Sequence, residues 1–223
     1  MRAALQLAFV DSVNLLLIGV IVAVGIVAPA RNRRYAKTVA LLIAGDWLGV
    51  ASLALLMLVI FDGLGPAVQH FVEGPVFGWL LVATGAVTGV LAIRGGDNSA
   101  LTARIMRPLG TPGPLTVVTG FVLGLVQSAT SFPFYGGLAV LSASGIEPAV
   151  RYASIPLYAS VALSLPTLSA LLVGWVRVKP NSAAGRAFSW ARTHPQAVTL
   201  AATWAVAALL IALGATHLVS AGR

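Results

Sequence analysis

The chain has 223 residues, of which 58% are hydrophobic and 9% are charged, and its formal net charge is +8. So high an apolar share lies outside the range of soluble domains and predicts a membrane protein. The charges lie in short clusters between apolar runs, which is typical of connecting loops and argues against nucleic acid as a partner. The absence of cysteine excludes disulfides, thiolate metal sites and dithiol redox chemistry.

Six apolar segments are long enough to cross the hydrocarbon core of a membrane, which takes about 20 residues. They are 3–29, 38–61, 75–93, 115–146, 152–176 and 195–220. We therefore expect an all-α, multi-pass protein of the plasma (inner) membrane. The first segment also resembles a cleaved signal peptide, because Arg2 precedes it and "APA" ends it. Its length and the polar Asp11 and Asn14 in its core favour a retained helix.

Positive charge marks one side of the predicted membrane protein. Three alternate connections, 31–37, 94–114 and 177–194, carry four, three and four of the 14 Lys and Arg residues. The positive-inside rule places such basic connections in the cytoplasm. Both termini are then expected on the outer side.

The second half of the chain repeats features of the first. At an offset of 116 residues, "FVDSVN" (9–14) falls on "LVQSAT" (125–130), and at 117 residues "RYA" at 34–36 falls on "RYA" at 151–153. Three spans per unit is an odd number, so two such units would have opposite orientations, as in inverted-repeat transporters. The expected division is a three-helix repeat at 1–93, a cytoplasmic linker at 94–114 and a second three-helix repeat at 115–223.

The fourth apolar segment is too long and too polar for one continuous helix. Residues 115–144 would extend about 45 Å as a helix, against a hydrocarbon core of about 30 Å. Pro133 removes an amide donor, and Gly136 and Gly137 weaken helix. A break is expected over 128–135. Non-helical backbone at membrane depth persists only when it is buried in protein or faces a water-filled cavity.

Two carboxyl groups, Asp11 and Asp46, lie inside predicted spans. An ionisable group at that depth costs about 2.5–3.5 kcal/mol, so each is a candidate for contact with protons or substrate. The alternative is a packing role, with Asp11 capped by Ser12 or Asn14. The predicted pathway residues are Asp11, Ser12, Asn14, Asp46, Gln127, Ser128, Thr130, Ser131, Pro133, Tyr135, Gly136 and Gly137.

Signatures of catalysis and of metal binding are missing from the sequence. There is no glycine-rich phosphate loop, no G-x-S-x-G motif and no intramembrane serine–histidine pair. The three histidines are isolated near span ends, and no H-x-x-x-H motif or carboxylate–histidine cluster appears. We expect neither an enzyme nor a bound metal or other cofactor.

The polar "DSVN" in the first span and the Ser/Pro/Gly break in the fourth resemble the LysE superfamily and, more distantly, its CcdA/DsbD-like relatives. Within that superfamily, "FVDSVNLLLIGVIVAV" is most similar to the GAP (Sap) family of peptidoglycolipid-addressing proteins. The resemblance implicates Asp11, Ser12 and Asn14, and in the second repeat Ser128, Ser131, Pro133 and Gly137. Relatives often have proline after the asparagine, where this chain has Leu15, which argues against a break in the first span.

The function expected from the sequence is export of an envelope lipid or glycolipid, or of a small amphipathic solute. Transport would proceed by alternating access between the two repeats, with Asp11 and Asp46 coupling to protons. Membrane lipids are expected partners, together with a second copy of the chain or an envelope-export complex. A non-transporting scaffold for lipid synthesis or export is the alternative, and an intramembrane lipid enzyme is a third hypothesis.

Overall fold

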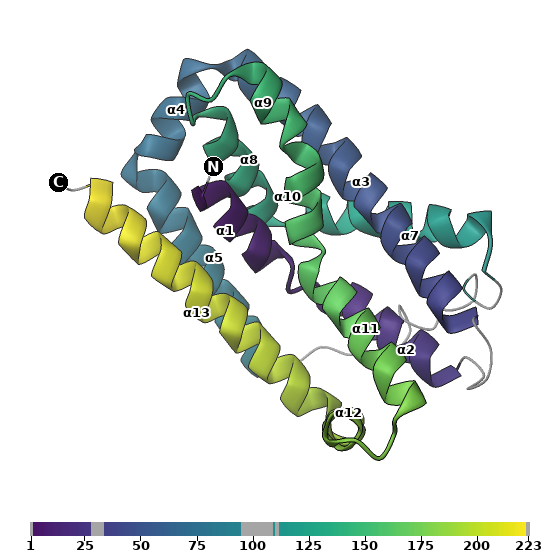
Figure 1. Cartoon of the computed structure of the whole chain (residues 1–223). Coiled ribbons are helices and arrows are strands. Elements are labelled where there is room, and N and C mark those ends of the chain that lie inside the picture. Colours follow the sequence, from purple (N-terminus) through teal and green to yellow (C-terminus); the bar gives the residue numbers. More distant parts are fainter. Residues whose placement is uncertain (1, 28–33, 95–108, 110–111, 222–223) are drawn as a thin grey trace.

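The computed structural model describes residues 2–27, 34–94, 109 and 112–221. Every regular element in these ranges is a helix, as expected (Figure 1). The long helices and their bounds are α1 (Arg2–Asp11), α2 (Leu15–Val27), α3 (Arg34–Leu64), α5 (Pro75–Arg94), α7 (Pro114–Ala129), α8 (Phe132–Ser142), α10 (Ile155–Ala162), α11 (Ser164–Val178) and α13 (Pro195–Ala221). Most of the predicted linker 94–114, and residues 31–33 of the first basic connection, lie outside the described residues.

One helix, α3, is long and apolar enough by itself to cross a membrane. Three pairs of helices meet at sharp bends and would each make one broken span: α1 with α2 at 50°, α7 with α8 at 76°, and α10 with α11 at 43°. The described residues thus contain one to four candidate membrane-spanning helices, which indicates a membrane location. The prediction of a broken fourth segment is confirmed, with a shorter break than expected.

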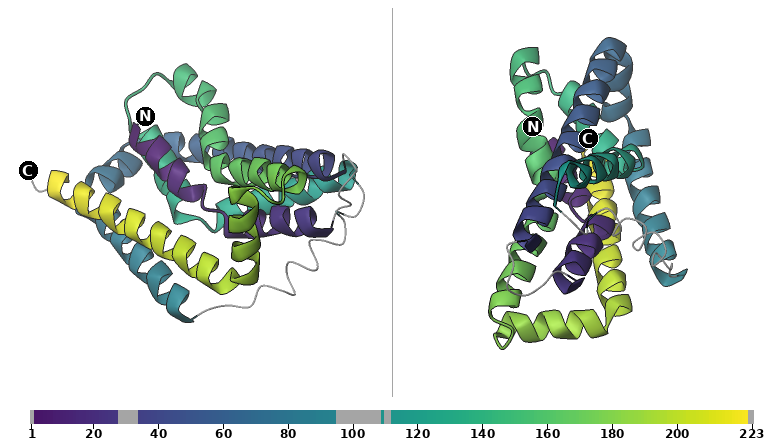
Figure 2. Two further views of the ribbon diagram at one scale, coloured as in Figure 1. Left: turned by 60° about the horizontal axis from the view of Figure 1, so that its bottom comes forward. Right: turned by 90° about the vertical axis from the view of Figure 1, so that its right-hand side faces the viewer.

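The connections 62–74 and 177–194 contain helices that the hydropathy pattern did not predict. They are α4 (Pro66–Glu73) and α12 (Ala183–Thr193), and a further short helix, α9 (Pro148–Ala153), precedes α10. Val68 of α4 is buried against α8, and Phe188 of α12 packs on the core. Each helix therefore forms because it has an apolar side to bury. In the right-hand view of Figure 2, α12 lies across the end of the molecule.

The helices pack in pairs that join distant parts of the sequence. Helix α3 packs along α7, α5 runs beside α13, and α1 and α2 contact α10 and α11 (Figures 1 and 2). Helix α1 also lies against α8. Two large apolar clusters result, one around α1, α8, α10 and the end of α3, the other around α2, α11 and the beginning of α3.

The contact between α3 and α7 is made by four glycines. Gly45 and Gly49 of α3 lie against the backbone of α7, and Gly120 and Gly124 of α7 lie against the backbone of α3. A Cβ at Gly120 would collide with the carbonyl oxygen of Leu42. Paired G-x-x-x-G segments allow two membrane helices to approach at backbone distance. This contact fixes the register of α3 on α7.

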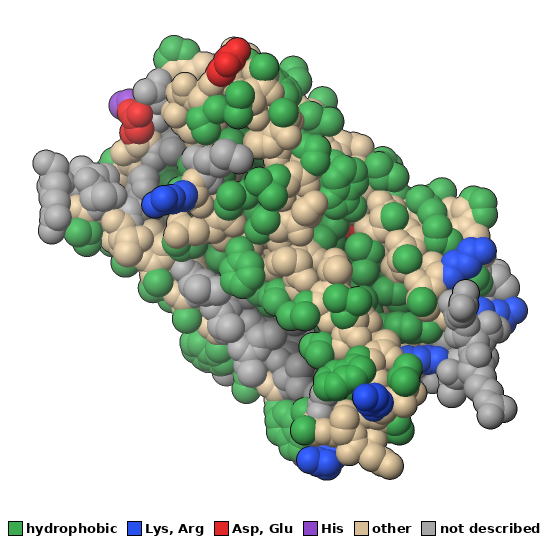
Figure 3. All heavy atoms as spheres, in the orientation of Figure 1, with side chains coloured by type: hydrophobic (Ala, Val, Ile, Leu, Met, Phe, Trp, Pro, Cys, Tyr) green, Lys and Arg blue, Asp and Glu red, His purple; other side chains and the backbone are tan. Residues whose placement is uncertain are grey.

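Charge separates toward the two ends of the molecule. On the face in Figure 3, most lysine and arginine side chains gather at one end, and acidic side chains lie mainly at the other, with a basic side chain near them. Hydrophobic side chains cover much of the surface between. Val118, Val122 and Val126, all on α7, are each about half exposed. An apolar belt between charged ends is what a lipid bilayer requires.

Candidate functional site

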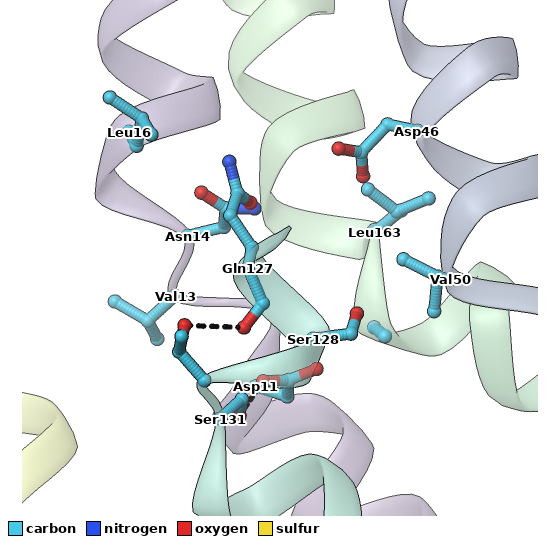
Figure 4. Close-up of a pocket in the computed structure, with 12 residues that line it drawn as sticks. Asp11, Val13, Asn14, Leu16, Asp46, Val50, Gln127, Ser128, Ser131 and Leu163 are labelled. Carbon is cyan, nitrogen blue, oxygen red and sulfur yellow. Dashed lines mark hydrogen bonds between the residues drawn. The ribbon is translucent and has the colours of Figure 1, made fainter. Parts of the chain in front are cut away.

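A cavity of about 300 Å³ lies where the bends of the broken helices meet. Figure 4 shows side chains from α1, α2, α3 and α7 around it. It is bordered by Val50 of the first apolar cluster and Leu163 of the second, so it lies at their junction. The lining residues are Asp11, Val13, Asn14, Leu16, Asp46, Val50, Gln127, Ser128, Thr130, Ser131, Ala162 and Leu163.

The break between α1 and α2 is produced by two short polar side chains. The hydroxyl of Ser12 donates to the carbonyl of Phe9 in the last turn of α1. Asn14 begins α2, because its Oδ1 accepts the amide of Leu17 at 2.9 Å. Serine and asparagine compete for backbone groups in this way and favour helix ends over helix interiors.

The break between α7 and α8 consists of Thr130 and Ser131. Thr130 ends α7, with its hydroxyl donating to the carbonyl of Gln127 at 3.0 Å. Ser131 caps α8, because its Oγ accepts the amide of Phe134 at 3.3 Å. Pro133 lies in the first turn of α8, where its missing amide leaves no hydrogen bond unmade.

A hydrogen bond joins the two breaks. The hydroxyl of Ser131, at the start of α8, donates to the carboxylate of Asp11, at the end of α1. Figure 4 shows this pair at one side of the cavity. Residues 120 positions apart in the chain are thereby tied at the point where each broken helix changes direction.

Asp46 and Gln127 face the cavity without hydrogen-bond partners in the structure. Asp46 is fully buried, and both of its carboxylate oxygens are unpartnered. The amide nitrogen and oxygen of Gln127 are also buried and unpartnered. The glycine contact explains why both line one cavity, since Gly124 of α7 lies directly against the backbone of Asp46. Buried polar groups without partners are rare, and each one calls for a ligand, water or another explanation.

A third bend borders the cavity at Leu163, between α10 and α11. Pro166 has no amide hydrogen, so it cannot bond the carbonyl of Ala162 four residues earlier. Both Ala162 and Leu163 line the cavity. Proline bends this helix pair beside the site.

Seven of the twelve pathway residues predicted from the sequence line the cavity: Asp11, Asn14, Asp46, Gln127, Ser128, Thr130 and Ser131. The other five do not. Ser12, directly after α1, is fully buried, and the hydroxyl of Tyr135 donates to the carbonyl of Ala129. Pro133, Gly136 and Gly137 are buried in α8, where a Cβ at Gly137 would lie 2.6 Å from the hydroxyl of Tyr158.

The residues that the sequence did not single out are the apolar part of the wall: Val13, Leu16, Val50, Ala162 and Leu163. Aliphatic side chains carry no chemical signal in a chain this apolar. Leu163 is the exception, because the offset of 117 residues places it on Asp46. That correspondence was readable from the sequence.

A separate polar cluster lies at the acidic end of the molecule. Arg151 of α9 bonds the carboxylate of Asp62 and the carbonyl of Ser142, each at 2.7 Å. The hydroxyl of Ser142 donates to the same carboxylate at 2.5 Å. A second cavity, of about 490 Å³, borders these three residues. This ion pair was not predicted, because its members come from three predicted loops or span ends.

An arginine also ties the basic end. Arg177 of α11 donates to the carbonyl of Gly25 in α2, and its guanidinium lies over the ring of Tyr35 at 4.9 Å from the ring centre. The hydroxyl of Tyr35 donates to the carbonyl of Ala170 at 3.0 Å. At each end, therefore, an arginine holds the carbonyl of a residue close to the end of a half-helix, α2 or α8.

Within the described ranges, no three His, Asp or Glu side chains gather as ligands for a metal ion. Comparison of the chain with protein-family models, with curated proteins and with solved structures finds no match.

Proposed function

We propose that this chain is a six-span membrane transporter of two inverted three-helix units, which carries a small polar solute through the cavity between its broken helices. Residues 3–27, α3 and α5 form the first unit, and residues 114–178 and α13 form the spans of the second. Transport follows alternating access, in which the site opens to one side of the membrane at a time. The resemblance to the GAP family stays a prediction from the motifs quoted above.

The observation that carries the proposal is the pair Asp46 and Gln127. Four buried polar atoms of these two side chains face one cavity and have no partner. Leaving such groups unsatisfied in a folded protein costs free energy, so they are retained where a ligand or water completes them. A membrane scaffold needs no unsatisfied polar groups in its interior.

The helix pairing supports the inverted repeat. Exchanging the two units converts the α3–α7 contact into the contact of α10 and α11 with α1 and α2, and leaves the α5–α13 pair unchanged. The offset of 117 residues, which matched the "RYA" segments, also aligns Asn14 with Ser131. Both residues cap the second half of a broken span by accepting the amide three positions later. This register replaces the offset of 116 that the first motif suggested.

The size of the cavity favours one of the two cargoes expected from the sequence. About 300 Å³ is the lower end of the range for small-molecule sites, and it leaves no room to enclose a lipid or glycolipid. A solute of a few heavy atoms fits. Its polar groups would meet Asp46 and Gln127, and its apolar part would meet Val50 and Leu163.

The orientation is testable by labelling, since the chain has no native cysteine. Ala149 of α9 and Ala183 of α12 are exposed at opposite ends of the molecule. With an impermeant maleimide on intact cells, we expect Ala149→Cys to be labelled and Ala183→Cys to be labelled only after permeabilisation, because the basic end faces the cytoplasm. The reverse pattern would invert the topology.

Cysteine accessibility inside the membrane tests the transporter itself without knowledge of the substrate. Thr130, at the end of α7, lines the cavity, whereas Val122 of α7 lies on the apolar outer surface. We expect Thr130→Cys to react with a small charged methanethiosulfonate added from either side, and Val122→Cys to stay unreactive because it faces lipid. Equal, slow reaction at both positions would remove the cavity from any aqueous pathway and favour the scaffold function.

A further inference from the structure

Charge in the cavity wall has one sign. Among the described residues that line it, the wall contains two carboxylates, Asp11 and Asp46, and no lysine, arginine or histidine. Among the described arginines, Arg151 is paired with Asp62 at the acidic end, and Arg177 is bonded to Gly25 near the basic end. No basic side chain of the wall can therefore neutralise a carboxylate there, and the compensating charge must come from a ligand or from protons.

The helix ends at the cavity do not provide an anion site. Each break joins a helix C-terminus to a helix N-terminus, so the opposite dipole charges of the two ends offset one another. The N-terminal amides that would bind an anion are already occupied in part, Leu17 by the side chain of Asn14 and Phe134 by that of Ser131. The two carboxylates therefore decide whether the site prefers a cation or an anion.

Asp46 is the side chain of the wall that most directly indicates a ligand. It is fully buried, it faces the cavity, and neither of its oxygens has a partner (Figure 4). Gln127 adds an unpartnered carbonyl oxygen from α7. Three acceptor oxygens from two helices thus line one space, beside the unpartnered amide nitrogen of Gln127. The excess of acceptors and the carboxylate charge suit a group that carries several N–H donors and a positive charge.

We propose that the cavity binds a small organic cation, an ammonium or guanidinium group on a short aliphatic stem, with Asp46 as its counter-ion. The charged group lies against Asp46 and Gln127, and the stem lies against Val50 and Leu163 on the apolar part of the wall. An inorganic ion would leave most of the 300 Å³ filled with water alone. This inference rests on the proposed transport function and names the class of its substrate.

Binding is tested on the purified full-length chain in nanodiscs, by calorimetry and by thermal stabilisation, with three probes of nearly equal shape. They are n-butylammonium, neutral butyramide and anionic n-butyrate. We expect n-butylammonium to bind and the other two not to bind. Equal binding of butyramide, or stronger binding of butyrate, would overturn the proposal, and so would displacement of n-butylammonium by equimolar sodium or potassium.

Two variants of cavity residues and one control variant test whether negative charge in the cavity strengthens the binding of n-butylammonium. Asp46→Asn keeps the shape and removes the charge, so we expect about tenfold weaker binding of n-butylammonium or more. Gln127→Glu adds a carboxylate and should strengthen binding. Glu147→Gln makes the same chemical change as the first variant on an exposed residue outside the cavity, and it should bind like wild type. Should Asp46→Asn fail to fold, Gln127→Glu decides alone, and unchanged or weaker binding contradicts the proposal.

Failure of this inference differs from failure of the transport function. If n-butylammonium does not bind and Thr130→Cys still reacts from both sides, the transporter stands and its substrate is not a cation. If Thr130→Cys is also inert, both proposals fall.

Discussion

Gly45→Ala is expected to destabilise the protein by at least about 3 kcal/mol, the upper end of what an overpacked contact usually costs. The new Cβ would collide with the carbonyl oxygen of Val117. That neighbour is helix backbone, which cannot rotate away as a side chain can. The two helices would have to separate, and the packing along α3 and α7 would be lost with them.

Gly63→Ala is the matched control, because it makes the same substitution in the same helix. A Cβ at Gly63 would meet nothing within 4 Å. We expect it to stabilise the helix by up to about 1 kcal/mol, the difference in helix propensity between alanine and glycine. Unfolding of both variants in detergent, followed by circular dichroism, measures the contrast. Similar stability of the two variants would show that the glycines are not needed for the contact.

Asp11→Asn is expected to abolish transport and leave the fold intact. The asparagine Oδ1 can still accept the hydrogen bond from Ser131, so α1 stays tied to α8, but the site loses one of its two carboxylates. Complementation of a strain that lacks the chain, followed by profiling of small molecules in cells, envelope and medium, measures the loss. Wild-type complementation by this variant would leave Asp11 a packing role.

Ser131→Ala separates the two roles of the Asp11–Ser131 contact. It removes the cap of α8 as well as the hydrogen bond to Asp11, and the loss of a serine cap costs about 1 kcal/mol. We expect a lower unfolding temperature with transport reduced in part, the opposite profile to Asp11→Asn. Matching profiles for the two variants would mean that the carboxylate acts only through this hydrogen bond.

Hydropathy and composition were sufficient to predict that the fold is helical and where the long helices lie. Each apolar run must satisfy its own backbone hydrogen bonds in lipid, and a helix does so. The break in the fourth segment was also predictable. The residues that cause the break are not the expected ones. Pro133, Gly136 and Gly137 lie inside α8, and the chain turns at Thr130 and Ser131. Two hydroxyl side chains end one helix and begin the next, with proline in its accepted first turn.

The sequence left open whether the first segment is broken, because Leu15 stands where relatives have proline. The structure has a 50° bend there. Asn14 in fact carried the signal, as a polar residue able to cap the helix that follows it. The pairing between helices that are distant in the chain could not be predicted from the sequence. The segments G-x-x-x-G at 45–49 and 120–124 could be read, but which glycines meet depends on how all the helices pack together.

Backbone contact between α3 and α7 has a mechanical consequence. Two helices whose glycines interlock cannot slide past one another without a collision, so this pair is a rigid frame built from both halves of the chain. In the proposed transport cycle, movement would then occur in the three bent helix pairs, which are α1–α2, α7–α8 beyond Thr130, and α10–α11. The bends of all three pairs border the cavity. Asp46 lies on α3, which belongs to the rigid pair, and Asp11 lies on α1, which belongs to one of the bent pairs. Under the proposed alternating access, the distance between the two carboxylates is therefore the quantity that would change as the molecule opens to one side or the other.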